Sequence, residues 1–209
     1  MNNGELLQLT YYQYFKWRHQ YKLIITEYLM DNHLTNKADF LESEIWILTI
    51  GGAFQRANVY QDTADEKVRG SFRSELHEQL KSIAEKYRTE ASGEEHIVNI
   101  ENLSNFSKKF ENILKGGQLN FGVSQKLLNL YLKYQWCLDK IPTPPHFPVD
   151  RVIQQALKID ITPWTQMQGK EDYKRIIGLA KEALKKEAYK QFNSIAELEL
   201  YLFSRRNEK

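Results

Sequence analysis

Apolar side chains recur every three or four residues along most of the chain, and this spacing is typical of amphipathic helices. It predicts helices over residues 11–19, 22–30, 41–61, 94–114, 122–138, 149–157 and 170–186. Two-residue alternation rich in β-branched side chains, the pattern of a half-buried strand, is almost absent. The sequence therefore predicts an all-α fold.

Capping residues predict where several helices begin. Thr63-Ala64-Asp65-Glu66 has the form of a capping box and would open a long, mostly charged helix that runs through Arg88. Ser194-Ile195-Ala196-Glu197 is a second box and opens the last predicted helix. Thr162-Pro163 is typical of a cap followed by a proline in the first turn.

Glycine and proline predict where helices are interrupted. Gly51-Gly52 marks a break or a close backbone approach within residues 41–61, because glycine costs about 1 kcal/mol relative to alanine in a helix. Gly116-Gly117 would close the helix over residues 94–114 in a left-handed turn. The run from Pro142 to Pro148 excludes a helix, since each proline restricts both itself and the residue before it.

Composition is that of an ordinary globular protein. The chain has 209 residues, of which 42% are hydrophobic and 27% charged, and these fractions exclude a disordered chain. This length allows one large domain or two small interlocked ones. Since no linker, repeat or low-complexity tract divides it, we expect residues 1–209 to form a single compact all-helical domain.

Charge and cysteine content exclude several kinds of protein and binding site. The 29 Lys and Arg residues against 27 Asp and Glu residues give a net charge of +2, which does not by itself indicate nucleic-acid binding. Cys137 is the one cysteine, so the sequence excludes a disulfide framework and a multi-cysteine zinc site. It contains no secretion signal and no apolar stretch near the ~18 residues of a membrane span. We therefore expect a cytoplasmic protein.

Residues 115–157 hold the one group of residues with the pattern of a chemical site. A glycine turn precedes a helix that carries Lys126 in its first turns, and a proline-rich crossing then leads to Pro148-Val149-Asp150-Arg151. A helix followed by a returning loop can bring Asp150 close to Lys126. A position near a helix N-terminus and partial burial would lower the lysine pKa, whereas Asp150 would raise it, so the sequence leaves the net shift open.

These residues resemble a known family. Gly122-Val123-Ser124-Gln125-Lys126, followed by Phe147-Pro148-Val149-Asp150-Arg151-Val152, is similar to the core of the helix-hairpin-helix DNA glycosylase superfamily, which includes endonuclease III and the 8-oxoguanine glycosylases. In that family a lysine stands four residues after the first glycine of a G-V-G-T-K hairpin, and a P-V-D segment supplies an aspartate. This chain lacks the proline and the second glycine of the family's hairpin. Residues 50–58 are also similar to a family segment that probes the DNA strand.

The resemblance implies a two-lobed helical fold with a cleft between interlocked lobes, and double-stranded DNA with a damaged or modified base as the partner of a monomer. A nucleotide would flip into a pocket, where Lys126 attacks the anomeric carbon and Asp150 stabilises the developing positive charge or relays a proton. The Schiff base so formed can lead to strand cleavage. No cofactor and no metal is implied, and one cysteine excludes an iron–sulfur cluster. The residues expected to contact DNA are Gly122, Ser124, Gln125, Gln55, Arg56, Asn58, His146 and Arg151.

Simpler interpretations of the same residues remain open at the level of sequence. Lys126 is also compatible with a solvated surface lysine, and Asp150 with an ordinary helix-start residue. His146 is equally compatible with a loop histidine packed on proline. The chain as a whole would then be a catalytically inactive helical module that binds nucleic acid, or a protein–protein adaptor in which the P-V-D match is accidental. The sequence does not predict which base is excised.

Overall fold

The structure, a computed structural model, describes residues 36–203. Internal contacts divide the chain into two compact units, 1–51 and 52–209. The helices expected over residues 11–19 and 22–30 lie outside the described residues. The boundary between the units falls at Gly51-Gly52, inside a helix, and the site described below lies within the second unit.

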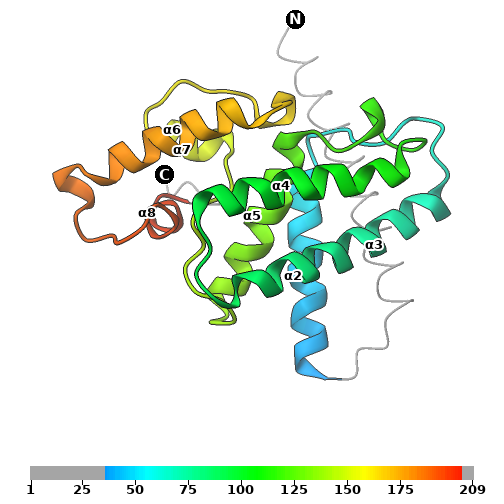
Figure 1. The fold of residues 1–209 in the computed structure, drawn as a ribbon, viewed down its shortest axis with the longest axis horizontal. Helices are drawn as coiled ribbons and strands as arrows, with labels where there is room; N and C mark the ends of the chain where they lie inside the picture. The colour runs from blue at the N-terminus through cyan, green and yellow to red at the C-terminus, as the bar shows by residue number, and fades with distance from the viewer. Residues whose placement is uncertain (1–35, 204–209) are drawn as a thin grey trace, which may run out of the picture. The chain divides into compact units, whose positions relative to one another are not determined.

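The described residues are mainly α-helical, which confirms the all-α prediction (Figure 1). The helices are α2 (Lys37–Phe54), α3 (Glu66–Glu85), α4 (Gly93–Ser107), α5 (Phe121–Cys137), α6 (Arg151–Ala156), α7 (Lys170–Leu184) and α8 (Ile195–Leu202). Short 3-10 turns lie between them. Between residues 36 and 203 the only β-type pairing is an isolated bridge from Tyr60 to Leu114. In the same range, no helix is long and apolar enough to cross a membrane.

Helix α5 is the central element of the second unit. It packs most extensively against α4, and it also contacts α3 and the 3-10 turn Trp164–Gln166. Helix α8 packs against both α6 and α7 (Figure 1). Every residue of α5 from Phe121 to Lys133 is buried, including several polar ones. Because burying a polar group without a partner costs free energy, we expect most of those side chains to be bonded inside the protein, and Gln125, Lys126 and Lys133 are. The hydroxyl of Ser124, in contrast, has no hydrogen-bond partner.

The glycine pair in α2 does not interrupt the helix, so the predicted break is wrong. Helix α2 runs through Gly51-Gly52 and ends at Phe54. A Cβ atom added at Gly52 would lie 2.7 Å from Leu130 Cδ1 of α5. The alternative prediction, a close approach, is therefore confirmed at Gly52.

Several predicted helix ends shift by a few residues. The N-cap of α3 is Asp65, which accepts a hydrogen bond from the Val68 amide, so the box predicted to start at Thr63 is wrong. Helix α4 ends at Ser107, well before Gly116-Gly117, although both glycines do adopt positive φ.

The later caps are partly confirmed. Pro163 begins only a 3-10 turn rather than an α-helix. Ser194 caps α8 as predicted. In a capping box the Glu197 carboxylate would accept from the Ser194 amide, but here it accepts from the amide of Asn193. The proline-rich run after α5 contains no helix, as predicted. It leads to Asp150, which is the N-cap of α6.

Candidate functional site

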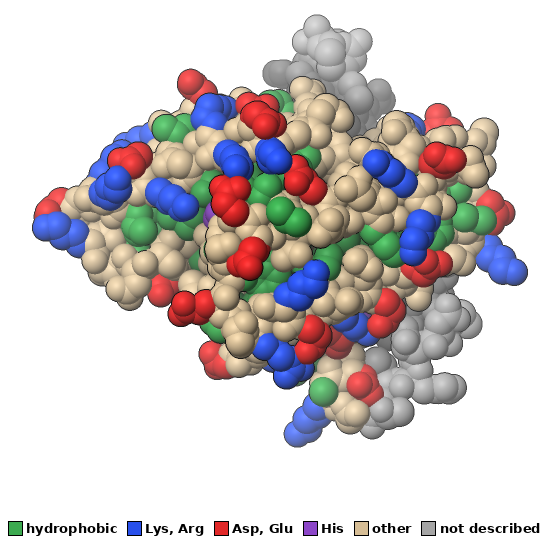
Figure 2. All heavy atoms as spheres, in the orientation of Figure 1, with side chains coloured by type: hydrophobic (Ala, Val, Ile, Leu, Met, Phe, Trp, Pro, Cys, Tyr) green, Lys and Arg blue, Asp and Glu red, His purple; other side chains and the backbone are tan. Residues whose placement is uncertain are grey.

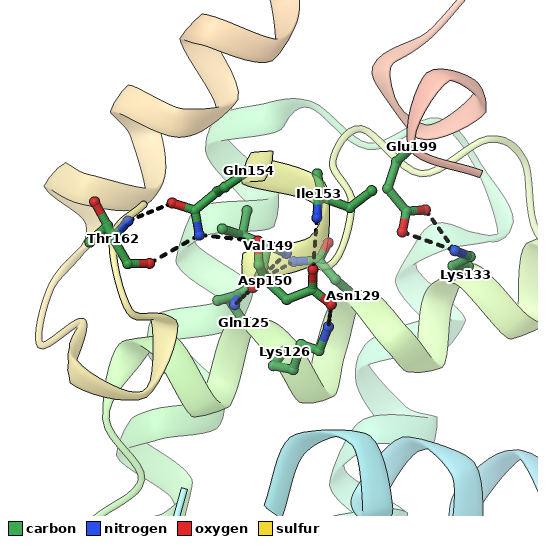
Figure 3. A network of polar contacts seen from close by, with 10 residues as sticks. All are labelled: Gln125, Lys126, Asn129, Lys133, Val149, Asp150, Ile153, Gln154, Thr162 and Glu199. Carbon is green, nitrogen blue, oxygen red and sulfur yellow. Dashed lines mark hydrogen bonds and ion pairs between the residues drawn. The ribbon is translucent and has the colours of Figure 1, made fainter. Parts of the chain in front are cut away.

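Lys126 and Asp150 form an ion pair between two helices (Figure 3). The Lys126 Nζ atom lies 2.6 Å from Asp150 Oδ2. Lys126 stands on the second turn of α5, and Asp150 precedes the first residue of α6. The two side chains retain 7% and 15% of their exposure, respectively. The returning loop thus brings together the two residues that the sequence singled out.

Each oxygen of the Asp150 carboxylate has its own donor. Oδ1 accepts the Ile153 amide at 3.0 Å and so caps α6, while Oδ2 accepts from Lys126. The Asp150 carbonyl accepts from both the backbone and the side-chain amide of Gln154, each at 3.1 Å. The carboxylate therefore contacts both the first turn of α6 and the second turn of α5.

Burial lowers the pKa of Lys126. Desolvation is the largest influence, because removing an ammonium from water disfavours its charged form. The charge of Asp150 and its hydrogen bond act in the opposite direction, and Glu199 and Lys133 add smaller opposing effects. The net direction, which the sequence left open, is downward and favours a neutral amine.

Gln125 links α5 to the backbone just before Asp150. Its Nε2 donates to the Val149 carbonyl at 2.9 Å, and its Oε1 accepts the Val149 amide at 3.1 Å. Gln154 makes a similar double contact with the backbone of Thr162, at 3.0 and 2.7 Å (Figure 3). Both glutamines are completely buried.

A second buried ion pair, which the sequence analysis missed, lies further along α5. Lys133 Nζ is 2.7 Å and 3.0 Å from the two carboxylate oxygens of Glu199 in α8. The same amine lies 4.3 Å from the centre of the Phe203 ring. Burial raises the pKa of Glu199, although the Lys133 charge opposes that shift. Lys133 follows Lys126 by two helical turns, and this spacing is the sequence signal for a second lysine on one face.

Four residues expected to contact DNA lie inside the protein, so the structure corrects their proposed roles. Gly122 is buried, and its amide donates to the Met167 carbonyl at 3.0 Å. Ser124 and Gln125 are fully buried. His146 is 3% exposed and packs against Tyr173 and His96. In this conformation none of the three side chains is accessible to a phosphate, and the Gly122 amide already has an acceptor.

The other expected contacts are accessible. Gln55, Arg56 and Asn58 are exposed in the turn that follows α2, and Asn58 adopts a positive φ of 45°. Arg151 is exposed at the first position of α6, directly after Asp150. These four residues retain the surface exposure that a contact with DNA requires.

Positive and negative side chains are interspersed over the face shown in Figure 2. Many exposed lysines have an acidic partner, as in the pairs Lys174–Glu94 at 2.9 Å and Lys185–Glu182 at 2.7 Å. These pairs show that much of the basic charge lies next to acidic groups, in keeping with the net charge of +2.

Residues 36–203 contain no group of three His, Cys, Asp or Glu side chains arranged to hold a metal ion. The fold and the site thus define a helical protein with a buried lysine–aspartate pair. Comparison of the chain with protein-family models, with curated proteins and with solved structures found no match.

Proposed function

We propose that this chain is a DNA glycosylase with an AP-lyase step, in which Lys126 is the nucleophile and Asp150 its proton acceptor. The observation that carries the proposal is the 2.6 Å contact between Lys126 Nζ and Asp150 Oδ2. An amine attacks only when it is neutral, and burial lowers the pKa of this one. A carboxylate within hydrogen-bond reach can take up the proton that the amine loses.

The reaction proceeds in three stages. Lys126 attacks the anomeric carbon of a flipped nucleotide, and the bond from that carbon to the base breaks, so the base leaves with the electron pair. While ionised, Asp150 stabilises the positive charge that develops on the sugar; it then takes up the proton that the attacking amine loses and passes it to the departing base. The lysine and the opened sugar then form a Schiff base, which permits cleavage of the DNA strand.

The proposal includes the two-lobed arrangement with a cleft that the family resemblance implies. Arg151 would contact the DNA backbone beside the site, since it is exposed and adjacent to Asp150. Gln55, Arg56 and Asn58 are exposed and would contact the strand around the flipped nucleotide.

Borohydride trapping on an oligonucleotide with an abasic site tests the role of Lys126. We expect a covalent adduct with the native chain and none with Lys126→Ala. Lys140→Ala is the control, because Lys140 is an exposed lysine just beyond the end of α5. An adduct that survives in Lys126→Ala would assign the chemistry to another amine. Salt-sensitive DNA binding without any adduct would favour a catalytically inactive nucleic-acid-binding module.

Asp150→Asn tests the carboxylate separately from the helix cap. Asparagine is as good an N-cap as aspartate, so the bond to the Ile153 amide persists while the charge is lost. We expect base release to be abolished in single-turnover assays, with the chain still folded by circular dichroism. Asp150→Ala also loses the cap, so its free energy of unfolding should be about 1 kcal/mol lower than that of Asp150→Asn, as measured by urea denaturation. Normal base release by Asp150→Asn would exclude the proposed role of the carboxylate.

A further inference from the structure

Gln125 holds both main-chain groups of the residue that precedes Asp150. The two hydrogen bonds, 2.9 Å to the Val149 carbonyl and 3.1 Å from the Val149 amide, fix the peptide planes on either side of Val149. The second of these planes contains the nitrogen of Asp150. Gln125 is itself the neighbour of Lys126 in α5, so one turn of helix carries both the amine and the side chain that locates its partner (Figure 3).

The carboxamide of Gln125 has only one satisfactory orientation. If it were flipped, its NH2 group would face the Val149 amide and its oxygen would face the Val149 carbonyl. Asn129 enforces the same orientation, because its Nδ2 donates to Gln125 Oε1 at 3.3 Å. The same Nδ2 atom also donates to the hydroxyl of Tyr173 at 3.0 Å. All three side chains are buried, where a lost hydrogen bond is not replaced by water.

Asp150 depends on these side-chain contacts because it lies outside regular helix. Its backbone is extended, with φ of −143° and ψ of 179°, and it follows a proline-rich run that contains no helix. Gln154 holds the Asp150 carbonyl on the far side. The carboxylate is thus located by one glutamine before it and another after it.

We propose that Gln125 is a positioning residue, whose grip on the main chain of Val149 holds the Asp150 carboxylate against the Lys126 amine. The inference rests on the proposed function in taking this pair as the reacting groups, but the contact itself is measurable without DNA. Without these two hydrogen bonds, the extended segment around Val149 becomes more mobile. The Asp150 carboxylate then lies next to Lys126 for only part of the time. Since the charge and hydrogen bond of Asp150 are the largest influences that raise the pKa of this buried lysine, releasing Asp150 lowers that pKa further.

The test is an NMR titration of the lysine 13Cε signals in the full chain. An opposite charge at this range changes a pKa by about 1–3. The change in the Lys126 pKa found for Asp150→Asn therefore measures the effect of removing the Asp150 charge completely. We expect Gln125→Met, which keeps the side-chain volume and removes both bonds, to lower the Lys126 pKa by at least half of the shift found for Asp150→Asn. A Lys126 pKa equal to that of the native chain in folded Gln125→Met would overturn the proposal.

Asn99→Leu is the matched control. Asn99 is also a buried amide, and its Nδ2 donates to the Tyr87 hydroxyl at 3.1 Å, away from Val149. It should cost similar stability and leave the Lys126 pKa unchanged. A shift in Asn99→Leu as large as that in Gln125→Met would show that general loosening, and not the grip on Val149, controls the pair.

Hydrogen exchange in the native chain covers the case in which Gln125→Met fails to fold. If Gln125 and Asp150 act together, the Val149 amide, bonded to Gln125, and the Ile153 amide, bonded to Asp150, open in one event. We expect equal protection of the two amides. Fast exchange at Val149 beside a protected Ile153 would overturn the proposal.

The trapping assay separates this inference from the proposed function. With Gln125→Met the acid limb of the pH profile for adduct formation should move to lower pH, because the lysine becomes neutral at lower pH. If the native chain forms no adduct while the Lys126 pKa still shifts in Gln125→Met, the proposed function fails and the positioning role stands. If the adduct forms normally and neither its pH profile nor the pKa moves, the positioning role fails alone.

Discussion

Gly122 illustrates how the same residue can serve a different purpose from the one its motif indicates. The family resemblance implied that it lies in a hairpin and contacts DNA. Instead it lies in the first turn of α5, against the backbone of the 3-10 turn Trp164–Gln166. A Cβ atom at this position would lie 1.6 Å from the Trp164 carbonyl oxygen and 2.8 Å from its carbon. Only glycine permits this approach, since the obstacle is main chain and cannot rotate away.

Gly122→Ala should therefore be strongly destabilising, and Gly178→Ala provides a matched control. Gly178 lies exposed in the interior of α7, and an added Cβ there meets nothing within 4 Å. We expect Gly122→Ala to lower the free energy of unfolding by about 3 kcal/mol or more, the upper end of overpacking effects. Gly178→Ala should raise it by about 0.5–1 kcal/mol through helix propensity. Urea denaturation measures both, and equal stability of the two variants would contradict the packing at Gly122.

At the residue scale, the sequence singled out Lys126 and Asp150, which the structure pairs, but misassigned their neighbours. Lys126 and Asp150 stood out because each occupies a recognisable position, near a helix start and after Pro148-Val149. Gln125 was expected to contact DNA only because it stands in the segment that resembles the family's hairpin. Its role depends on Val149, which arrives only through the path of the intervening chain. Local pattern contains no information about such a partner.

At the element scale, α5 is a helix whose buried charges are matched by two other elements. Lys126 is paired with the N-cap of α6, and Lys133 with Glu199 of α8. Two oppositely charged groups removed from water are tolerated only with good geometry and matched partners. The lysines of α5 thus pair with acidic groups at the start of α6 and within α8.

Removing one member of the Lys133–Glu199 ion pair should lower the free energy of unfolding more than removing both members. In Lys133→Met the Glu199 carboxylate, whose side chain is 3% exposed, loses its counter-ion, and we expect a loss of about 3–5 kcal/mol in the free energy of unfolding. Adding Glu199→Leu removes the unpaired charge and should restore most of that loss. The comparison of single and double variants by urea denaturation checks this. A double variant no more stable than Lys133→Met would mean that the cost comes from packing alone.

Hydrophobic periodicity predicted the elements more reliably than their ends. The expected helix 122–138 matches α5, Phe121–Cys137, because its apolar stripe is long and unbroken. The predicted break at Gly51-Gly52 failed because the cost of glycine in a helix is small. Here the glycine instead allows close packing, at Gly52 on Leu130. A modest propensity is outweighed by packing when a neighbouring helix needs the space.

At the scale of the whole molecule, two buried histidines make stability sensitive to acid. His96 Nδ1 lies 2.7 Å from the Tyr87 hydroxyl, and His146 Nδ1 lies 3.2 Å from the Tyr173 hydroxyl. The two imidazole rings are 4.9 Å apart. Burial lowers the pKa of His96 well below its usual value and that of His146 to about 3. Both histidines are therefore neutral in the folded chain at neutral pH.

Stability should fall as the pH falls below 6.5, the ordinary histidine value. The unfolded chain then binds protons that the folded chain excludes, so each histidine contributes a loss of about 1.4 kcal/mol per pH unit. For His146 this continues down to about pH 3. His146→Gln keeps an acceptor for Tyr173 and cannot be protonated, so its stability should fall less steeply between pH 6 and 4.5. Urea midpoints measured across that range decide the matter, and an unchanged slope would contradict a neutral, buried His146.

The sequence by itself determined the helical class and most of the helices, and it singled out Lys126 and Asp150, which form an ion pair in the structure. These follow from local periodicity and from residue types at short spacing, which the chain carries wherever it folds. Tertiary structure decided what those residues contact: Gln125 on Val149, Lys133 on Glu199, and Gly122 on the backbone of Trp164. The physical reason is that each of these contacts joins residues distant in sequence, and burial gives it strength only after the helices have packed.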